Sequence, residues 1–206
     1  MVGVSRLCGM ERLLCVYCAS GLELDSKYYT AGAELGSGLA GRGWGLVYGG
    51  GRAGVMGSVA LATRAAGGRV VGVIPDFMVE RELAYHEADE LIVTNSMRER
   101  RRIMEERAQA FVALPGGFGT LEELIEILMG RLLNRHAKPL ILVNQDGFYD
   151  ELLGFFDKLV REGFKKSGWR DMMPVAATVD EVWPLLARET GAAVGLGSAA
   201  VDPLWR

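Results

Sequence analysis

A glycine-rich turn between an apolar run and an acidic helix has the residue types to bind an anion beside a carboxylate. The apolar run 110–114 leads into the turn Pro-Gly-Gly-Phe-Gly-Thr at 115–120, and Glu122 and Glu123 follow. Glycines leave backbone amides unobstructed, and a helix N-terminus favours an anion. The segment therefore predicts a phosphate site with carboxylates within one helical turn of it.

Glu123 also has a purely structural interpretation. Thr120 and Glu123 have the spacing of a capping box, in which the glutamate side chain satisfies a backbone N–H at the start of the helix. The sequence favours neither capping nor chemistry. A Glu123→Gln variant separates the two, since glutamine can still cap but cannot act as a carboxylate.

The segment 95–108 is dense in arginine and has a helical pattern. Arg100 precedes Ile103 by three residues and Met104 by four, so it shares the apolar side of the predicted helix. Arg101 has a similar relation to Met104. A guanidinium held at an apolar edge needs a carboxylate or a phosphate as partner. Arg100 is therefore a candidate site residue, and an ordinary solvated face is the alternative for the rest of the helix.

Another glycine-rich loop follows an earlier predicted strand. Gly49, Gly51 and Gly54 have the spacing of a dinucleotide fingerprint, which makes an NAD(P)-dependent oxidoreductase an alternative function. The loop follows the second predicted strand rather than the first, and Asp76 stands past the end of the next strand; both points weaken this alternative. A packing turn is the structural interpretation, and in either case something approaches the backbone closely.

Two further loops follow the same logic. The first predicted strand ends in the small turn 19–21, where Ser20 offers a hydroxyl and a ligand can approach closely, although an ordinary strand-to-helix turn fits equally well. Glu82 lies in the acidic loop 79–83, and acids in loops are usually solvated. Neither residue predicts a site by itself.

These segments belong to an alternation of apolar runs and helical patterns. The predicted strands are 13–19, 45–48, 70–74, 89–93, 110–114 and 139–143, and the predicted helices are 26–41, 54–66, 96–108, 120–133 and 148–162. Residues 178–181 resemble the start of a last short helix. Continuous apolar runs are typical of strands covered on both faces, and the β-α order implies right-handed crossovers. We expect an α/β fold with a doubly wound parallel sheet, which binds ligands beyond the carboxyl ends of its strands.

Length and composition set the broad class. The chain has 206 residues and a net charge of −3, which fits one domain and argues against a binder of nucleic acid polymers. We predict a single domain over 12–190, with 1–11 and 191–206 as flexible termini. No run is long enough to cross a membrane, so no membrane partner is predicted and the cytoplasm is the default location.

Cys15 and Cys18 form a CxxC, but no second pair or nearby histidine completes a metal site. At strand spacing the two thiols point to opposite faces, which indicates buried positions rather than a redox pair. No metal is predicted.

Four segments together resemble the LONELY GUY (LOG) family of cytokinin riboside 5'-monophosphate phosphoribohydrolases. They are YGGG at 48–51, GVMG at 54–57, SMRERR at 96–101 and PGGFGTLEE at 115–123, and the resemblance covers roughly residues 13–188. It implies a Rossmann-like fold in three α-β-α layers and a homodimer with sites near the subunit interface. It also implies hydrolysis of a nucleoside 5'-monophosphate to free base and ribose 5-phosphate without a cofactor.

The resemblance assigns roles by position. Arg100 and Glu123 match the catalytic pair, with Glu123 stabilising the charge on the ribose and Arg100 keeping that carboxylate ionised. The predicted substrate-binding residues are Ser20, Gly50, Gly51, Glu82, Met97, Arg101, Gly116, Gly117, Phe118, Gly119, Thr120 and Glu122. No residue is assigned as the acid that protonates the leaving base; His86 and His136 are candidates by type only, and an ordinary surface position is the alternative for each.

The chain departs from the family pattern beyond the segment PGGFGTLEE at 115–123. Met129, Gly130 and Leu132 stand where members often have threonine, tryptophan and glutamine, which puts the base pocket or a dimer contact in doubt. Molybdenum-cofactor carriers share the fold and the PGG motif, so a carrier without hydrolase activity is the other alternative.

Overall fold

A computed structural model describes residues 12–195 of the chain. Seven strands form one parallel sheet in the order β4-β3-β2-β1-β5-β6-β7. The strands are β1 (Arg12–Tyr17), β2 (Trp44–Tyr48), β3 (Val70–Pro75), β4 (Glu90–Thr94), β5 (Ala110–Ala113), β6 (Leu140–Val143) and β7 (Val175–Ala176). The helices are α1 (Ser26–Ala40), α2 (Gly54–Ala65), α3 (Met97–Arg107), α4 (Phe118–Leu132), α5 (Asp150–Arg161), α6 (Trp169–Met172) and α7 (Val182–Gly195). This order confirms the predicted doubly wound parallel sheet.

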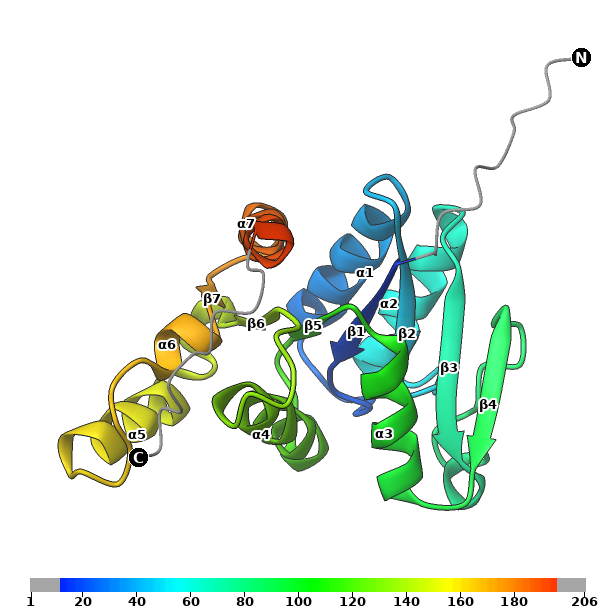
Figure 1. Ribbon diagram of the computed structural model, residues 1–206. Coiled ribbons are helices and arrows are strands. Elements are labelled where there is room, and N and C mark those ends of the chain that lie inside the picture. The colour runs from blue at the N-terminus through cyan, green and yellow to red at the C-terminus, as the bar shows by residue number, and fades with distance from the viewer. Residues whose placement is uncertain (1–11, 196–206) are drawn as a thin grey trace, which may run out of the picture.

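Helices cover both faces of the sheet, as predicted for three layers. Helices α1, α2 and α7 pack against one apolar core, and α3, α4, α5 and α6 pack against the other (Figure 1). Cys15 faces the second core and Cys18 the first, so the prediction of opposite faces is confirmed. Burial raises the pKa of both thiols, which keeps them protonated and structural.

Local signals set several helix ends where the sequence predicts them. The Asp25 carboxylate accepts from the Lys27 amide at the start of α1, and the Ser96 hydroxyl accepts from the Glu99 amide at the start of α3. Helix α7 continues to Gly195, past the predicted domain end at 190. Of the predicted flexible termini 1–11 and 191–206, residues 1–11 and 196–206 lie outside the described residues. Between residues 12 and 195, no helix is both long and apolar enough to span a membrane.

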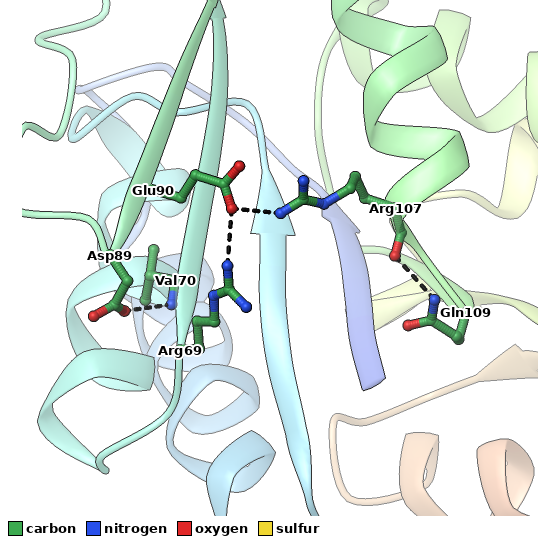
Figure 2. Close-up of polar contacts among 6 residues, drawn as sticks. All are labelled: Arg69, Val70, Asp89, Glu90, Arg107 and Gln109. Carbon is green, nitrogen blue, oxygen red and sulfur yellow. Dashed lines mark hydrogen bonds and ion pairs between the residues drawn. The ribbon is translucent and has the colours of Figure 1, made fainter. Parts of the chain in front are cut away.

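Paired charges hold the amino edge of the sheet. One oxygen of Glu90, the first residue of β4, accepts from Arg69 at 2.9 Å and from Arg107 at the end of α3 (Figure 2). Beside it, the Asp89 carboxylate accepts from the Val70 amide at 2.8 Å. These contacts join the starts of β3 and β4 to the carboxyl end of α3. They lie at the edge of the sheet where the strands begin, called the amino edge below.

The order in which the chain adds strands to the sheet reverses between β1 and β5. Strand β1 pairs with β2 on one side and with β5 on the other, so the chain leaves these neighbours in opposite directions. The loops that follow β1 and β5 diverge at this point and leave a crevice beyond the strand ends, which is where ligands bind in open parallel sheets.

Candidate active site

A cavity of about 430 Å³ occupies this crevice, and the loops and helices that follow β1 through β5 all contribute to it. The sequence-predicted residues that line it are Ser20, Glu82, Met97, Arg100, Gly117, Phe118, Gly119, Thr120 and Glu123. Segments far apart in the sequence therefore meet here because parallel strands place their carboxyl ends at one edge.

Arg100 is buried on α3 and is anchored by main-chain oxygens. Its Nε donates to the Val73 carbonyl at 3.1 Å and its Nη2 to the Gly49 carbonyl at 2.9 Å. Its Nη1 contacts the sulfur atoms of Met78 and Met97, both at 3.8 Å. Sulfur is a weak acceptor, so Nη1 is the part of the guanidinium that a ligand anion competes for most easily.

Glu82 is the carboxylate nearest to Arg100. Its Oε2 lies 3.5 Å from Arg100 Nη2, too far for a strong hydrogen bond, and that oxygen has no hydrogen-bond partner among the described residues. The side chain is buried, and burial raises its pKa, while the charges of Arg100 and Arg81 lower it in part. The ordinary solvated position of a loop acid therefore does not apply to Glu82, which is buried and lines the cavity.

Helix α4 presents an uncapped N-terminus to the cavity. It begins at Phe118 with Gly117 as N-cap, two positions before the predicted start at Thr120, and no side chain caps it. Thr120 is buried inside the first turn, so the capping-box interpretation is wrong. Gly116 is required behind this turn, because a side chain there would collide with Thr120. The first amides of α4 are free to bind an anion.

Glu123 follows one turn later and lines the cavity. Burial raises its pKa to about 7; Arg100 and Arg101 lower it in part, and Glu82 and Glu122 raise it further. Among the ion pairs of the described residues, none joins Arg100 to Glu123. Arg100 thus favours the ionised form of Glu123, in the direction expected from the sequence, but burial outweighs it and leaves the pKa near neutral.

The first glycine loop packs against protein rather than offering its amides to a dinucleotide. A side chain at Gly49 would collide with the Arg100 guanidinium, and Gly50, at a φ of 79°, packs on β3. The start of α2 is also occupied, since the Met56 amide donates to the Ala19 carbonyl at 3.2 Å. The packing interpretation is the one that fits, and the dinucleotide alternative loses its phosphate site.

Several predicted substrate-binding residues lie behind the cavity instead of on its surface. Gly50 packs on Val73 and Ile74 of β3, Gly51 packs on Glu82, and neither glycine lines the cavity. Arg101 pairs with Glu122 at 2.8 Å and with Glu126 at 2.6 Å, which ties α3 to α4 outside the cavity. Within this chain, then, Arg101 and Glu122 are structural partners of each other.

The apolar wall of the cavity was not predicted from the sequence. Met56, Met78 and Met104 line it together with Leu24. Met78 ends the short 3-10 helix Asp76–Met78 that follows β3, so its place in a loop after a strand was the available signal. A flexible methionine wall suits an apolar or aromatic group of variable shape.

The two histidines and the family departures lie elsewhere. His86 is exposed, while His136 is half-buried against Phe111 and Gly130, and burial lowers its pKa to about 4. The surface interpretation is thus wrong for His136. Neither histidine lines the cavity, and neither do the departure positions: Met129 is exposed near the far end of α4 and Leu132 is buried in the core. In the described part of the chain, no cluster of three or more His, Cys, Asp or Glu residues has a metal-binding arrangement.

Comparisons with known proteins agree with this geometry. Residues 56–186 match the family model described as "Possible lysine decarboxylase". The chain is 48% identical over 149 residues to the cytokinin riboside 5'-monophosphate phosphoribohydrolase of Mycobacterium tuberculosis, covering 72% of this chain and 79% of that one. It is 44% identical over 171 residues to the Oryza sativa protein of the same name, LOG, covering 83% and 71%.

Among solved structures, the molybdenum cofactor carrier protein of Chlamydomonas reinhardtii superposes with a TM-score of 0.68 at 23% identity, covering 88% of this chain and 99% of that one. That similarity shows the shared fold. The sequence matches, at higher identity and over most of both chains, show the family. The chain belongs to the LONELY GUY family of cytokinin riboside 5'-monophosphate phosphoribohydrolases.

Proposed function

We propose that this protein is a hydrolase that cleaves the N-glycosidic bond of a nucleoside 5'-monophosphate and releases the free base and ribose 5-phosphate. One observation carries the proposal within the family: a glutamate with a pKa of about 7 faces the same cavity as an uncapped helix N-terminus. An anion site beside a proton-exchanging carboxyl suits a phosphorylated sugar whose bond is to be hydrolysed.

Phosphate binding holds the substrate at a distance from the reacting bond. The amides of Gly117, Phe118, Gly119 and Thr120 would receive the phosphate at the positive end of the α4 dipole. Binding energy gained there orients the ribose C1' beside Glu123, one turn further along the helix. The methionine wall and Leu24 would contact the base.

Hydrolysis builds positive charge on the ribose as the bond from C1' to the base nitrogen breaks. Ionised Glu123 stabilises that charge and takes a proton from the attacking water, whose oxygen bonds to C1'. Overall, the hydroxyl goes to C1' and the proton to the base. A carboxylate with a pKa of about 7 is a stronger base than an ordinary glutamate, while at pH 7 about half of it is ionised.

We further propose a homodimer in the cytoplasm. Ile125, Met129 and Leu133 recur every four residues on the outer side of α4 and are 37%, 43% and 45% exposed. An exposed apolar stripe on the helix that carries Glu123 supports a subunit interface close to the site. Light scattering with size-exclusion chromatography gives the mass: a dimer supports the proposal, and a monomer at micromolar concentration contradicts it.

Base release tests the activity. The purified protein is incubated with AMP and, separately, with N6-isopentenyladenosine 5'-monophosphate, and products are separated by chromatography. The proposal expects free base and ribose 5-phosphate in equal amounts from at least one substrate, and none from the Glu123→Gln variant. Absence of base release together with tight retention of molybdenum cofactor would favour the carrier alternative.

A further inference from the structure

Three charged groups share the cavity, one cation and two acids, and the cation lies beside only one of the acids. Arg100 Nη2 is 3.5 Å from Glu82 Oε2, and the described ion pairs include none between Arg100 and Glu123. We propose that Glu82 is a positioning residue for the reaction: by compensating the charge of Arg100, it leaves the Glu123 carboxyl without a counter-ion of its own.

The position of Arg100 does not depend on Glu82. The guanidinium is fixed by the carbonyls of Val73, within β3, and of Gly49, directly after β2. Glu82 itself is held by its own loop, since the Glu82 carbonyl accepts from the Arg52 amide at 3.1 Å and its amide donates to the Met78 carbonyl. The two charges are therefore brought together by backbone geometry, and removing one charge leaves the frame in place.

The other groups that face Glu123 do not supply a free cation. From α3, Arg101 also lowers the pKa of Glu123, but it is already paired with Glu122 and Glu126 of α4. From β1 and the residue after it, the thiols and the phenol of Cys15, Tyr17 and Cys18 are kept neutral because burial raises the pKa of each. The pKa of Glu123 therefore depends most on how far the positive charge of Arg100 is offset by another acid, which here is Glu82.

The consequence concerns base strength. If Arg100 were uncompensated, it would favour the ionised form of Glu123 and make it a weak base. With Glu82 present, the carboxyl binds a proton near neutral pH. The inference rests on the proposed function only for the use made of this proton; the electrostatic relation itself exists in the unliganded protein.

The test is a titration of Glu123 in the unliganded protein by carbon-13 NMR with labelled glutamate. The Glu123 signal is identified as the one that the Glu123→Gln variant lacks. In Glu82→Gln, which keeps the shape and removes the charge, we expect the midpoint of the Glu123 titration to fall by about one pH unit or more. Glu80→Gln removes the same charge from the same loop at an exposed position and should leave the midpoint unchanged.

An unchanged midpoint in Glu82→Gln overturns the proposal, and so does an equal shift in both variants. Should Glu82→Gln not fold, Glu82→Ala removes the same charge and must give the same downward shift. With an active enzyme, the rising limb of kcat against pH should also move to lower pH in Glu82→Gln, whereas loss of a sugar contact alone would raise KM and leave the limb in place. Since the titration needs no turnover, its outcome is independent of whether wild-type protein releases base.

Discussion

The amino edge of the sheet, where the strands begin, and the carboxyl edge, where they end, use similar side chains in opposite ways. At the amino edge, one glutamate, Glu90, serves two arginines, and all three side chains are about one-third exposed. At the carboxyl edge, one arginine, Arg100, faces a cavity with two glutamates, and burial raises the pKa of both. Charges at the amino edge are paired with opposite charges and partly exposed to solvent. Charges at the carboxyl edge are shielded from solvent, and one arginine there faces two glutamates.

The difference separates stability from chemistry. Paired, partly exposed charges join neighbouring elements at little cost in desolvation. Buried acids with raised pKa values destabilise the fold at neutral pH, and such groups cluster where proton transfer is needed. Substitutions at the amino edge should therefore change stability alone, while those at the carboxyl edge should change activity, with a gain in stability in both cases below.

The largest effect is expected for Glu123→Gln on turnover. Loss of a general base of matched pKa typically lowers kcat by about 10²–10⁴-fold. Steady-state base release measures it, with circular dichroism as the check on folding. Turnover within a factor of two of wild type would show that Glu123 is not catalytic and that the two edges do not differ in function.

The same substitution should make the protein more stable at alkaline pH. The pKa of Glu123 in the fold, about 7, lies above the ordinary glutamate value of 4.5, so its contribution to stability is present at low pH and lost as pH rises toward 7. Glu123→Gln should thus raise the free energy of unfolding by up to about 3 kcal/mol at pH 8 and much less at pH 5. Urea denaturation at both pH values checks this; an equal change at both would contradict it.

Gly119→Ala tests the anion site at the start of α4. Nothing lies within 4 Å of a methyl group at this exposed position, and alanine favours the helix by about 0.5–1 kcal/mol, so stability should rise slightly. The methyl would crowd a phosphate on the amides, so we expect KM to increase about tenfold, equivalent to about 1.4 kcal/mol. An unchanged KM would place the phosphate elsewhere.

The smallest effects belong to the amino edge. Glu90→Gln removes the partner of Arg69 and Arg107, and because the charges are partly exposed we expect a loss of only about 1 kcal/mol of unfolding free energy, with kcat/KM unchanged. Loss of activity in Glu90→Gln with the fold intact would contradict the claim that the amino edge affects stability alone.

Arg102→Gln breaks the exposed pair with Glu106 on α3 and should lower the free energy of unfolding by less than about 0.5 kcal/mol.

The sequence carries most of the fold because each strand is a continuous apolar run that ends in a small or polar turn. The six predicted strands and five predicted helices all occur, with ends shifted by a residue or two. Strand β7 and helix α6 escaped prediction, since a strand of two residues and a helix of four have no measurable period.

The sequence predicts which loops form the site, but not which side chains within the site contact one another. Arg100 and Glu123 follow from the motifs and the carboxyl-edge rule, and both line the cavity. Sequence spacing does not say which acid faces Arg100, and Glu82 entered the predicted site only through the family resemblance, because acids in loops are usually exposed. Nor does it show that the amides after Gly49 pack against protein, since the same glycines serve a ligand or a neighbouring side chain.

The central claim is that the poorly compensated carboxyl of Glu123 lies beside the reacting sugar carbon while α4 holds the phosphate. The crystal structure of the Glu123→Gln variant with an unhydrolysed nucleoside 5'-monophosphate tests it most directly. The account predicts phosphate oxygens on the amides of residues 117–120 and C1' within about 3.5–4 Å of the substituted side chain or of a water bound to it. A phosphate bound at another edge, or a C1' remote from position 123, would contradict it.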